Sequence, residues 1–441
     1  MQLPEKVSFN WQSVLQKAFL ENTINIHEIV SENSEINVDL KNANTAYEYW
    51  DKIQYTVLPE NISPELFWAI VKFQRSALYS DKIKLGIYSF KYLLNPAILK
   101  KLAFIDSYNI KCSLSLDEEN EYYANAKMEE AIASSRLEGA SVSNEEAKEM
   151  LRVKAVPSNE SEKMVYADFA AMNFIEKNLN KELSPQLIKE LYGVITDEKT
   201  ENIFRSGSDG VRVVDIRDDA VLYEPPKAES IEDLLNLFCE YVNGENEPNH
   251  IIKAIIIHFL LAYIHPFADG NGRIARVLFY WYMLKHRYNG FKYLAISKVL
   301  RVIAPQYAKV FLYTEIDEND LTYFINFNLD VIIEAVNSFE SYLENKKEGG
   351  LTAETLISSG VKLNLRQQSI LKEFIKNNNI RNIEYFKNKL GVVYETVRKD
   401  LMFLTKKGFL AKSKAGKEFM YSLSKKYLQR ISEIENKQQI N

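Results

Sequence analysis

The stretch that decides the fold reads His265-Pro-Phe-Ala-Asp-Gly-Asn-Gly-Arg-Ile-Ala-Arg276. It follows an apolar, helix-like run over 251–264, and Pro266 disfavours α geometry at the residue before it, so a helix is expected to end at His265. The Gly-Asn-Gly sequence at 270–272 permits a tight turn, and an apolar run resumes directly after it. The stretch therefore predicts a helix end, a turn and a second helix start, with a histidine presented at the first junction.

The turn before the second helix has the chemistry of a phosphate site. The first N–H groups of a helix lack intrahelical partners and lie at the positive end of its dipole, so they bind anions. Arg273 and Arg276 are three residues apart and share one face of the first turn, which adds two guanidinium groups. Asp269, just before the turn, is placed to hold a Mg²⁺ ion that bridges phosphates and keeps several waters.

Each part of this stretch is more often structural when it occurs alone: a hydrogen-bonded histidine, a simple turn, or two solvated arginines. Together they combine a base, a metal ligand and an anion site, which is the set that phosphoryl or nucleotidyl transfer requires. A P-loop is excluded because the chain has no Gly-x4-Gly-Lys-Ser/Thr sequence.

These twelve residues resemble the signature of the Fic (filamentation induced by cAMP) family, His-x-Phe-x-Asp/Glu-Gly-Asn-Gly-Arg-x-x-Arg, at every defined position. Family members of this type transfer AMP from ATP to a Ser, Thr or Tyr hydroxyl of a protein. The resemblance implies that His265 takes the proton of the hydroxyl, that Phe267 anchors the loop, and that Asp269 binds Mg²⁺. It assigns ATP binding to Gly270, Asn271, Gly272, Arg273 and Arg276. It also gives Asn271 a catalytic role. Doc-type kinase relatives carry Lys in the place of Gly272, so the glycine favours AMP transfer over phosphorylation.

A second motif, Ser134-Ser-Arg-Leu-Glu138-Gly139, is similar to the family's inhibitory pattern, Ser/Thr-x-x-x-Glu-Gly/Asn. A chance helix-capping sequence is the alternative for so short a pattern. The resemblance implies an inhibitory helix over about 123–139, with Ser134, Glu138 and Gly139 as its functional residues. In this interpretation Glu138 occupies Arg276 in an ion pair and denies the γ-phosphate of ATP its partner. The same glutamate can support removal of AMP from modified proteins in this family, so hydrolysis is a further possible activity.

A Gly-containing turn and a β-branched stretch interrupt the helical pattern at 205–223 and predict a short hairpin. The resemblance identifies this hairpin as the family's flap. Its residues are expected to dock the target backbone by strand addition, and the candidates are Val211, Val213, Val214 and Ile216.

Helical periodicity dominates the rest of the chain, so the predicted fold class is mostly α: a Fic-type helical bundle with a small β-hairpin flap, plus a C-terminal winged-helix domain. We expect an N-terminal helical region over 1–112 and the Fic domain over 113–345. A linker with Gly349-Gly350 is expected over 346–364, and a winged helix-turn-helix domain over 365–441.

The C-terminal part is basic and the rest of the chain acidic. From Val361 onward there are 14 Lys and 4 Arg against 7 acidic residues, or +11, which leaves −16 for the first 360 of the 441 residues. In the winged-helix interpretation Tyr394–Asp400 takes the recognition-helix position and a hairpin with Lys412, Lys414 and Lys417 forms the wing. DNA is therefore a possible partner, and a domain that only contacts protein is the alternative.

Composition excludes several classes of protein. A hydrophobic content of 46% argues against a disordered chain, and two cysteines, Cys112 and Cys239, make neither a disulfide framework nor a zinc site unaided. The longest apolar run, over 254–264, is too short for a bilayer crossing, and 1–6 lacks the pattern of a secretory signal. We therefore expect a cytoplasmic protein without a membrane span.

The sequence thus predicts an ATP- and Mg²⁺-dependent protein adenylyltransferase that Glu138 inhibits. Two alternatives stay open: a DNA-binding regulator with a nucleotide-responsive Fic-like domain, and a de-AMPylating hydrolase. A homo-oligomer is possible. His258 and Trp281 are expected to be core residues, although an aromatic ring facing adenine could come from Trp281.

Overall fold

The computed structural model of the chain describes residues 3–21, 35–59, 62–80, 83–111, 116–196, 203–207, 210–214, 221–247, 249–358, 363–377, 380–390, 392–415, 418–427 and 429. These residues are mostly helical, with three small antiparallel sheets. The chain divides into two compact units, Met1–Phe339 and Glu340–Asn441. No helix among the described residues is both long enough and apolar enough to cross a membrane.

The first unit begins with a helical region that surrounds an aromatic core around Trp50 and Trp68. Arg75 is buried in this region and donates to the hydroxyl of Tyr323 at 3.0 Å, which ties it to the last helix of the unit. The elements are α1 (Trp11–Leu20), α3 (Glu35–Ala46), α4 (Trp50–Ile53), α5 (Pro64–Ser76), the hairpin β1 (Ile83–Leu85) and β2 (Tyr88–Phe90), and α6 (Pro96–Lys111).

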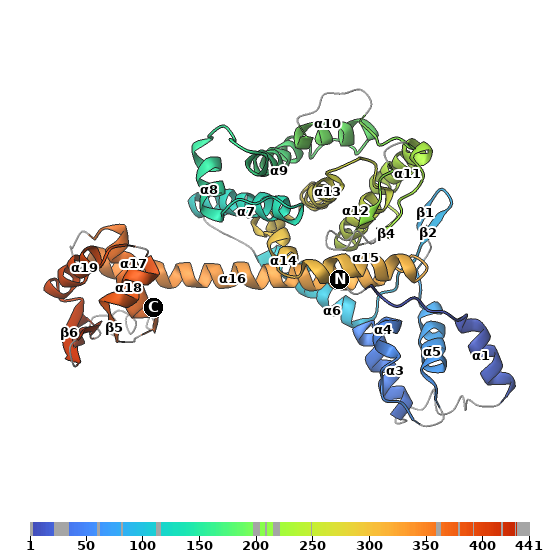
Figure 1. Cartoon of the computed structure of the whole chain (residues 1–441), viewed down its shortest axis with the longest axis horizontal. Helices are drawn as coiled ribbons and strands as arrows, with labels where there is room; N and C mark the ends of the chain where they lie inside the picture. The colour runs from blue at the N-terminus through green and yellow to red at the C-terminus, as the bar shows by residue number, and fades with distance from the viewer. Residues whose placement is uncertain are drawn as a thin grey trace. The chain divides into compact units, whose positions relative to one another are not determined.

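The centre of the first unit is α12 (His250–Ile264), which runs beside α13 (Asn271–Lys285) (Figure 1). Thirteen of the fifteen residues of α12 are buried, because its sequence is apolar on every face. The surrounding helices are α7 (Leu116–Leu137), α8 (Asn144–Val153), α9 (Glu160–Lys177), α10 (Pro185–Thr196), α11 (Ile231–Asn243), α14 (Ile296–Val302) and α15 (Ala304–Ile316). The loop between α12 and α13 is therefore held by a rigid core.

The expected flap is a two-stranded sheet of β3 (Val213–Val214) and β4 (Val221–Tyr223). Val213 pairs with Tyr223 and Val214 with Val221, with an irregularity between the two pairs. Residues 215–220, which join the strands, lie outside the described residues.

The structure has a helix over most of the length of the expected linker. Helix α16 (Thr322–Ser358) continues without a break through 346–358, and the two units divide after Phe339 rather than at 345. Gly349 and Gly350 disfavour a helix by only about 1 kcal/mol each, and good helix formers flank them. Glycines alone therefore do not end this helix.

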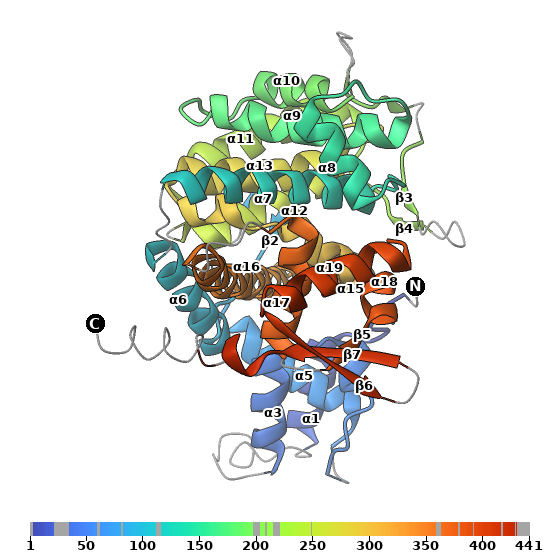
Figure 2. The same ribbon diagram turned by 90° about the vertical axis from the view of Figure 1, so that its left-hand side faces the viewer.

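The second unit contains α17 (Leu365–Asn377), α18 (Ile383–Leu390) and α19 (Tyr394–Lys406). They pack with a three-stranded sheet in the order β5 (Arg381–Asn382), β7 (Glu418–Leu423), β6 (Leu410–Ala415), which Figure 2 shows from one side. The three helices followed by a hairpin agree with the expected winged-helix order. The short strand β5, which the sequence did not predict, adds a third strand to the hairpin.

Candidate active site

His265 lies at the C-terminal end of α12 in a left-handed conformation, with φ of 52°. Its Nδ1 lies 3.2 Å from the carbonyl oxygen of Ala262, which can only accept, so Nδ1 carries the proton and Nε2 keeps its lone pair. Burial, reinforced by the charge of Arg205, lowers the pKa of His265 below its ordinary 6.5. The imidazole is therefore neutral at pH 7 and suited to accept a proton at Nε2.

The loop after His265 is anchored by two side chains. Phe267 is fully buried and stacks on Tyr192 with ring centroids 4.0 Å apart. Asn271 accepts from the N–H of Phe267 at 3.0 Å and donates to its carbonyl at 2.8 Å, so both polar ends of the Asn271 side chain are used within the loop. Asn271 therefore shapes the turn with its side chain, and its backbone N–H is the group left for a phosphate.

Helix α13 begins at the expected turn. Gly270 is its N-cap residue with φ of 81°, a conformation that favours glycine, and no side chain among the described residues caps this end. At Gly272 a β-carbon would collide with the carboxylate of Glu138 and lie 3.0 Å from Nη1 of Arg276. The first turn of α13 is thus open backbone, and the Glu138 carboxylate lies against it.

Arg276 is buried and its guanidinium group is held by the second motif. It donates through Nε to Oγ of Ser134 at 3.1 Å and through Nη2 to the Ser134 carbonyl at 3.1 Å. The same Nη2 lies 2.8 Å from Oε1 of Glu138, whose side chain is 27% exposed. The structure therefore brings Ser134 and Glu138 onto Arg276, which lies more than 130 positions further along the sequence.

Glu138 is placed by the way α7 ends. The helix stops at Leu137, one residue short of Glu138, so the motif's last two residues form a turn and not a helix. Gly139 has φ of 97°, and the N–H of Ala140 returns to the Ser135 carbonyl at 3.0 Å. A left-handed glycine after a helix is the usual way to satisfy its last carbonyls, which explains why Gly139 follows Glu138.

Arg273 lies between two carboxylates. Its Nη2 is 3.4 Å from Asp269, and its Nη1 is 4.0 Å from Asp168 on α9. Asp168 is buried and accepts from Oγ of Ser135 at 2.8 Å, while its other oxygen has no hydrogen-bond partner among the described residues. Burial, opposed in part by Arg273, raises the pKa of Asp168 to about 6.

Asp168 was not predicted from the sequence. Its only signal was a charged residue among Phe169, Ala170 and Ala171 in the middle of a helix, and many surface helices carry such a residue. Arg205, the first residue of the predicted hairpin region at 205–223, also belongs to the site. It donates through Nε to the His265 carbonyl at 2.6 Å, and its backbone N–H donates to the Pro266 carbonyl at 3.0 Å. The base of the hairpin therefore holds the start of the loop at 265–276.

Residues 182–283 match the family model described as "Fic/DOC family". This segment runs from α10 to α13 and includes the flap and the whole loop at 265–276. The chain contains a Fic domain.

Three curated relatives match parts of the chain. "Probable protein adenylyltransferase" of Aquifex aeolicus (strain VF5) is 36% identical over 56 residues, 13% of this chain and 18% of that protein. "Protein adenylyltransferase Fic" of Nematostella vectensis is 45% identical over 56 residues, 12% of this chain and 13% of that protein. "Protein adenylyltransferase and cysteine protease IbpA" of Histophilus somni is 27% identical over 113 residues, 25% of this chain and 2% of that protein. Each match spans less than a fifth of the relative's length.

Solved structures share the fold over a longer range. Fic-1 (aa134–508) from C. elegans has a TM-score of 0.51 at 18% identity and covers 78% of this chain and 90% of that chain. A Fic family protein from Desulfovibrio desulfuricans G20 has a TM-score of 0.49 at 19% identity, with 76% and 98% covered. At this identity the likeness to Fic-1 bears on the fold of the Fic domain and its surroundings.

A cavity of about 820 Å³ lies beside the loop of the Fic domain. Asp269 and Arg273 are on its wall, together with Lys163 and Tyr166 of α9 and Tyr192 of α10. Its volume is in the range of small-molecule sites, so the loop at 265–276 borders a space of suitable size for a nucleotide.

Asp269 is the only predicted metal ligand, and its side chain is 79% exposed. Among the described residues no group of three His, Cys, Asp or Glu side chains could hold a metal ion by itself. At nucleotide sites Mg²⁺ takes one or two carboxylates together with phosphate oxygens and waters. One exposed carboxylate beside a phosphate site therefore fits a Mg²⁺ ion that arrives with the nucleotide.

The remaining candidates separate into core and flap. His258 is buried with Nε2 2.7 Å from the Tyr307 hydroxyl, and Trp281 is 1% exposed and donates to the Asn178 carbonyl at 3.1 Å, so both belong to the core. Of the expected target-docking residues, Val213 and Val214 form β3, and Val211 precedes it and is half-buried. Ile216 lies outside the described residues.

Proposed function

We propose that the protein is an adenylyltransferase that transfers AMP from ATP to a Ser, Thr or Tyr hydroxyl of a target protein and that Glu138 holds it inactive. One observation carries the proposal. A neutral imidazole lies beside the open N-terminus of a helix that carries two buried arginines. A carboxylate in the turn after another helix forms an ion pair with one of those arginines. The short matches to proteins named adenylyltransferases support the same reaction class.

In the proposed reaction Nε2 of His265 takes the proton of the target hydroxyl as its oxygen attacks the α-phosphorus of ATP. The bond from that phosphorus to the bridging oxygen breaks, and pyrophosphate leaves. The backbone N–H groups at the start of α13 and the guanidinium groups of Arg273 and Arg276 stabilise the negative charge on the phosphates. Asp269 would hold Mg²⁺, which would neutralise part of the phosphate charge.

Inhibition follows from competition for the same group. The Glu138 carboxylate contacts Arg276 and lies against Gly272, so it fills the place where an outer phosphate would bind. Two anions cannot share this position without strong repulsion. Productive binding of ATP therefore requires Glu138 to move away.

The test is incubation of the full chain with α-labelled ATP and Mg²⁺, with label on protein as the readout. Glu138→Gly should modify itself and proteins of a lysate at least tenfold more than the wild type, and Glu138→Gly with His265→Ala should not. Absence of label from Glu138→Gly would overturn the proposal. The reverse activity is tested by adding unlabelled wild type to a protein that carries labelled AMP, because release of AMP identifies a hydrolase.

The second unit favours a second function, binding of duplex DNA. Lys412 and Lys414 are exposed on β6, in the wing position, and Arg398 and Lys399 lie on α19. Arg398 already pairs with Glu395 at 2.8 Å, so the wing offers the less neutralised charge. Lys417 of the expected wing lies outside the described residues.

A further inference from the structure

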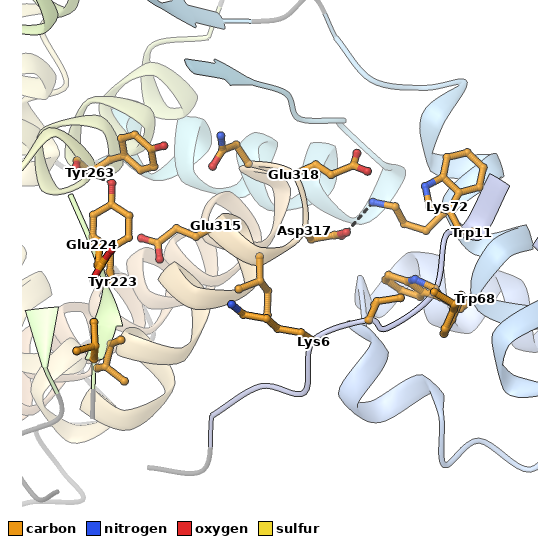
Figure 3. Close-up of a pocket in the computed structure, with 16 residues that line it drawn as sticks. Lys6, Trp11, Trp68, Lys72, Tyr223, Glu224, Tyr263, Glu315, Asp317 and Glu318 are labelled. Atoms are coloured by element: carbon orange, nitrogen blue, oxygen red, sulfur yellow. Dashed lines mark hydrogen bonds and ion pairs between the residues drawn. The ribbon is translucent and has the colours of Figure 1, made fainter. Parts of the chain in front are cut away.

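A second cavity, of about 650 Å³, lies beside strand β4 of the flap (Figure 3). Its walls come from the N-terminal segment, α5, the end of α12 and the end of α15 with the loop that follows. Aromatic rings form much of the lining: Phe9, Trp11, Trp68, Tyr223 and Tyr263. Nothing in the proposed reaction uses this space.

In the part of the chain that the structure describes, ion pairs account for all but one of the carboxylates on the cavity wall. Four carboxylates line it, together with Lys6 and Lys72. Three of the carboxylates have cationic partners: Asp317 pairs with Lys72 at 2.7 Å, Glu224 with Arg212 at 3.4 Å, and Glu318 with Lys91. The fourth, Glu315, has neither a hydrogen bond nor an ion pair among the described residues.

Glu315 lies at the apolar side of the cavity. In Figure 3 its carboxylate points toward Tyr223 and Tyr263 and away from the Lys72–Asp317 pair. Burial raises the pKa of Glu315 to about 8, as expected for a carboxyl group in an aromatic wall with no cation beside it. A cation in this cavity would supply the missing partner, and the rings would line its aliphatic stem.

The position of the cavity indicates that the cation belongs to a protein segment at the flap. The flap sheet has only two described strands, so β4 keeps a free edge, and the cavity is lined by β4 itself. Tyr223 of β4 donates to the Tyr263 carbonyl at 2.9 Å, two residues before His265. An extended chain advances about 3.3 Å per residue, so a protein segment at the flap reaches from the cavity to His265 within a few residues.

We propose that this cavity binds a lysine or arginine side chain of the protein substrate, with Glu315 as its partner, a few residues from the modified hydroxyl. The assignment rests on the proposed AMP transfer and adds a sequence preference to it.

The test uses the full chain with Glu138→Gly and an array of peptides. Each peptide has one Ser, Thr or Tyr as the acceptor, and Lys, Ala or Glu is placed in turn at each of the six positions on either side of that acceptor. AMP incorporation from labelled ATP is measured for Glu138→Gly alone, with Glu315→Gln and with Glu318→Gln. Glu315→Gln keeps the shape of the side chain, and Glu318→Gln is the matched control because Glu318 lines the same cavity and is already paired. Auto-modification and thermal unfolding of each variant are recorded in parallel.

We expect about a tenfold preference for Lys over Glu at one or two positions, lost with Glu315→Gln and kept with Glu318→Gln. The assignment is overturned if the Glu138→Gly protein modifies itself but shows no such preference or modifies no peptide. It is also overturned if the preference survives Glu315→Gln. If the Glu138→Gly protein modifies neither itself nor any peptide, the proposed AMP transfer is overturned and this assignment with it.

Discussion

At the scale of single residues, burial sets the protonation states that the proposed chemistry requires. His265 is neutral because burial disfavours its cation, and the Ala262 carbonyl selects the tautomer with a free Nε2. Asp168 is held in a buried site that disfavours its charge, beside two arginines that favour it. Each residue is therefore tuned by its surroundings and not by its identity alone.

His265→Ala in the Glu138→Gly background should lower AMP transfer by about 100-fold or more while ATP binding is kept, because the hydroxyl then loses its base. When His265 is present, its lowered pKa keeps the imidazole in the neutral, proton-accepting form down to a lower pH. Transfer should therefore begin to fall, as the pH is lowered, only at a lower pH than a histidine with the ordinary pKa of 6.5 would give. Rates from single-turnover assays and ATP binding by calorimetry check both parts. Near-normal transfer by the alanine variant would exclude His265 as the base.

Asp168→Asn should separate stability from function. The pKa of Asp168 is higher in the folded protein than the ordinary 3.8, so the charged form destabilises the fold above about pH 6. The neutral variant should therefore have a melting temperature at pH 8 no lower than that of the parent. Without the carboxylate Arg273 loses a partner that orients it, so the KM for ATP should rise about tenfold in the Glu138→Gly background. An unchanged KM would show that Asp168 does not position Arg273.

At the scale of elements, the site is a meeting of two helix ends. α7 ends in a left-handed glycine turn that projects Glu138, and α13 starts at Gly270 with free N–H groups. The ion pair between Glu138 and Arg276 joins the two ends. A carboxylate at a helix N-terminus is also favoured by the helix dipole, so both the ion pair and the dipole stabilise Glu138 in this position.

The two ends should be energetically coupled. Glu138→Gly should raise AMP transfer at least tenfold, whereas Arg276→Ala removes inhibition and phosphate binding together and should stay inactive. The double variant should then be as inactive as Arg276→Ala alone, because freeing an absent guanidinium group has no effect. Initial rates of the four proteins complete the cycle. Transfer by the double variant near that of Glu138→Gly would contradict the assigned role of Arg276.

At the scale of the whole molecule, the chain joins an acidic N-terminal part to a basic C-terminal part. Residues from 361 onward carry +11 and the first 360 carry −16. Such a division favours an acidic partner for the second unit. Its compact core, around Leu371, Phe374, Leu401 and Tyr421, presents the charged strand β6 on a rigid support.

The full chain should bind duplex DNA with an affinity that falls steeply as salt rises. Replacing Lys412 and Lys414 by Gln should weaken binding and reduce the slope of log K against log salt by about 2, one for each phosphate contact. Lys17→Gln with Lys52→Gln, which removes two charges from the first unit, is the control and should change neither. Fluorescence anisotropy across a salt series is the measurement. No binding even at low salt would favour a unit that contacts protein.

Local patterns were enough to predict several parts of the fold and the site. Pro266 and the glycines at 270 and 272 act on their own backbone, so the helix end, the turn and the start of α13 could be read directly. The all-apolar α12, the flap hairpin and the three helices with a wing also depend on short-range periodicity. The same reasoning failed at 346–358, where two glycines did not outweigh the helix formers around them.

The groups available for chemistry follow from the sequence, because the loop at 265–276 holds its histidine, aspartate and arginines within twelve residues. How these groups are paired and buried depends on the packing of the helices. This packing brought Ser134 and Glu138 onto Arg276, placed Asp168 beneath Arg273, and left Glu315 without a partner in an aromatic cavity. Burial and long-range contacts depend on how separate helices pack, and no local pattern encodes the distance between two residues that are far apart in the chain.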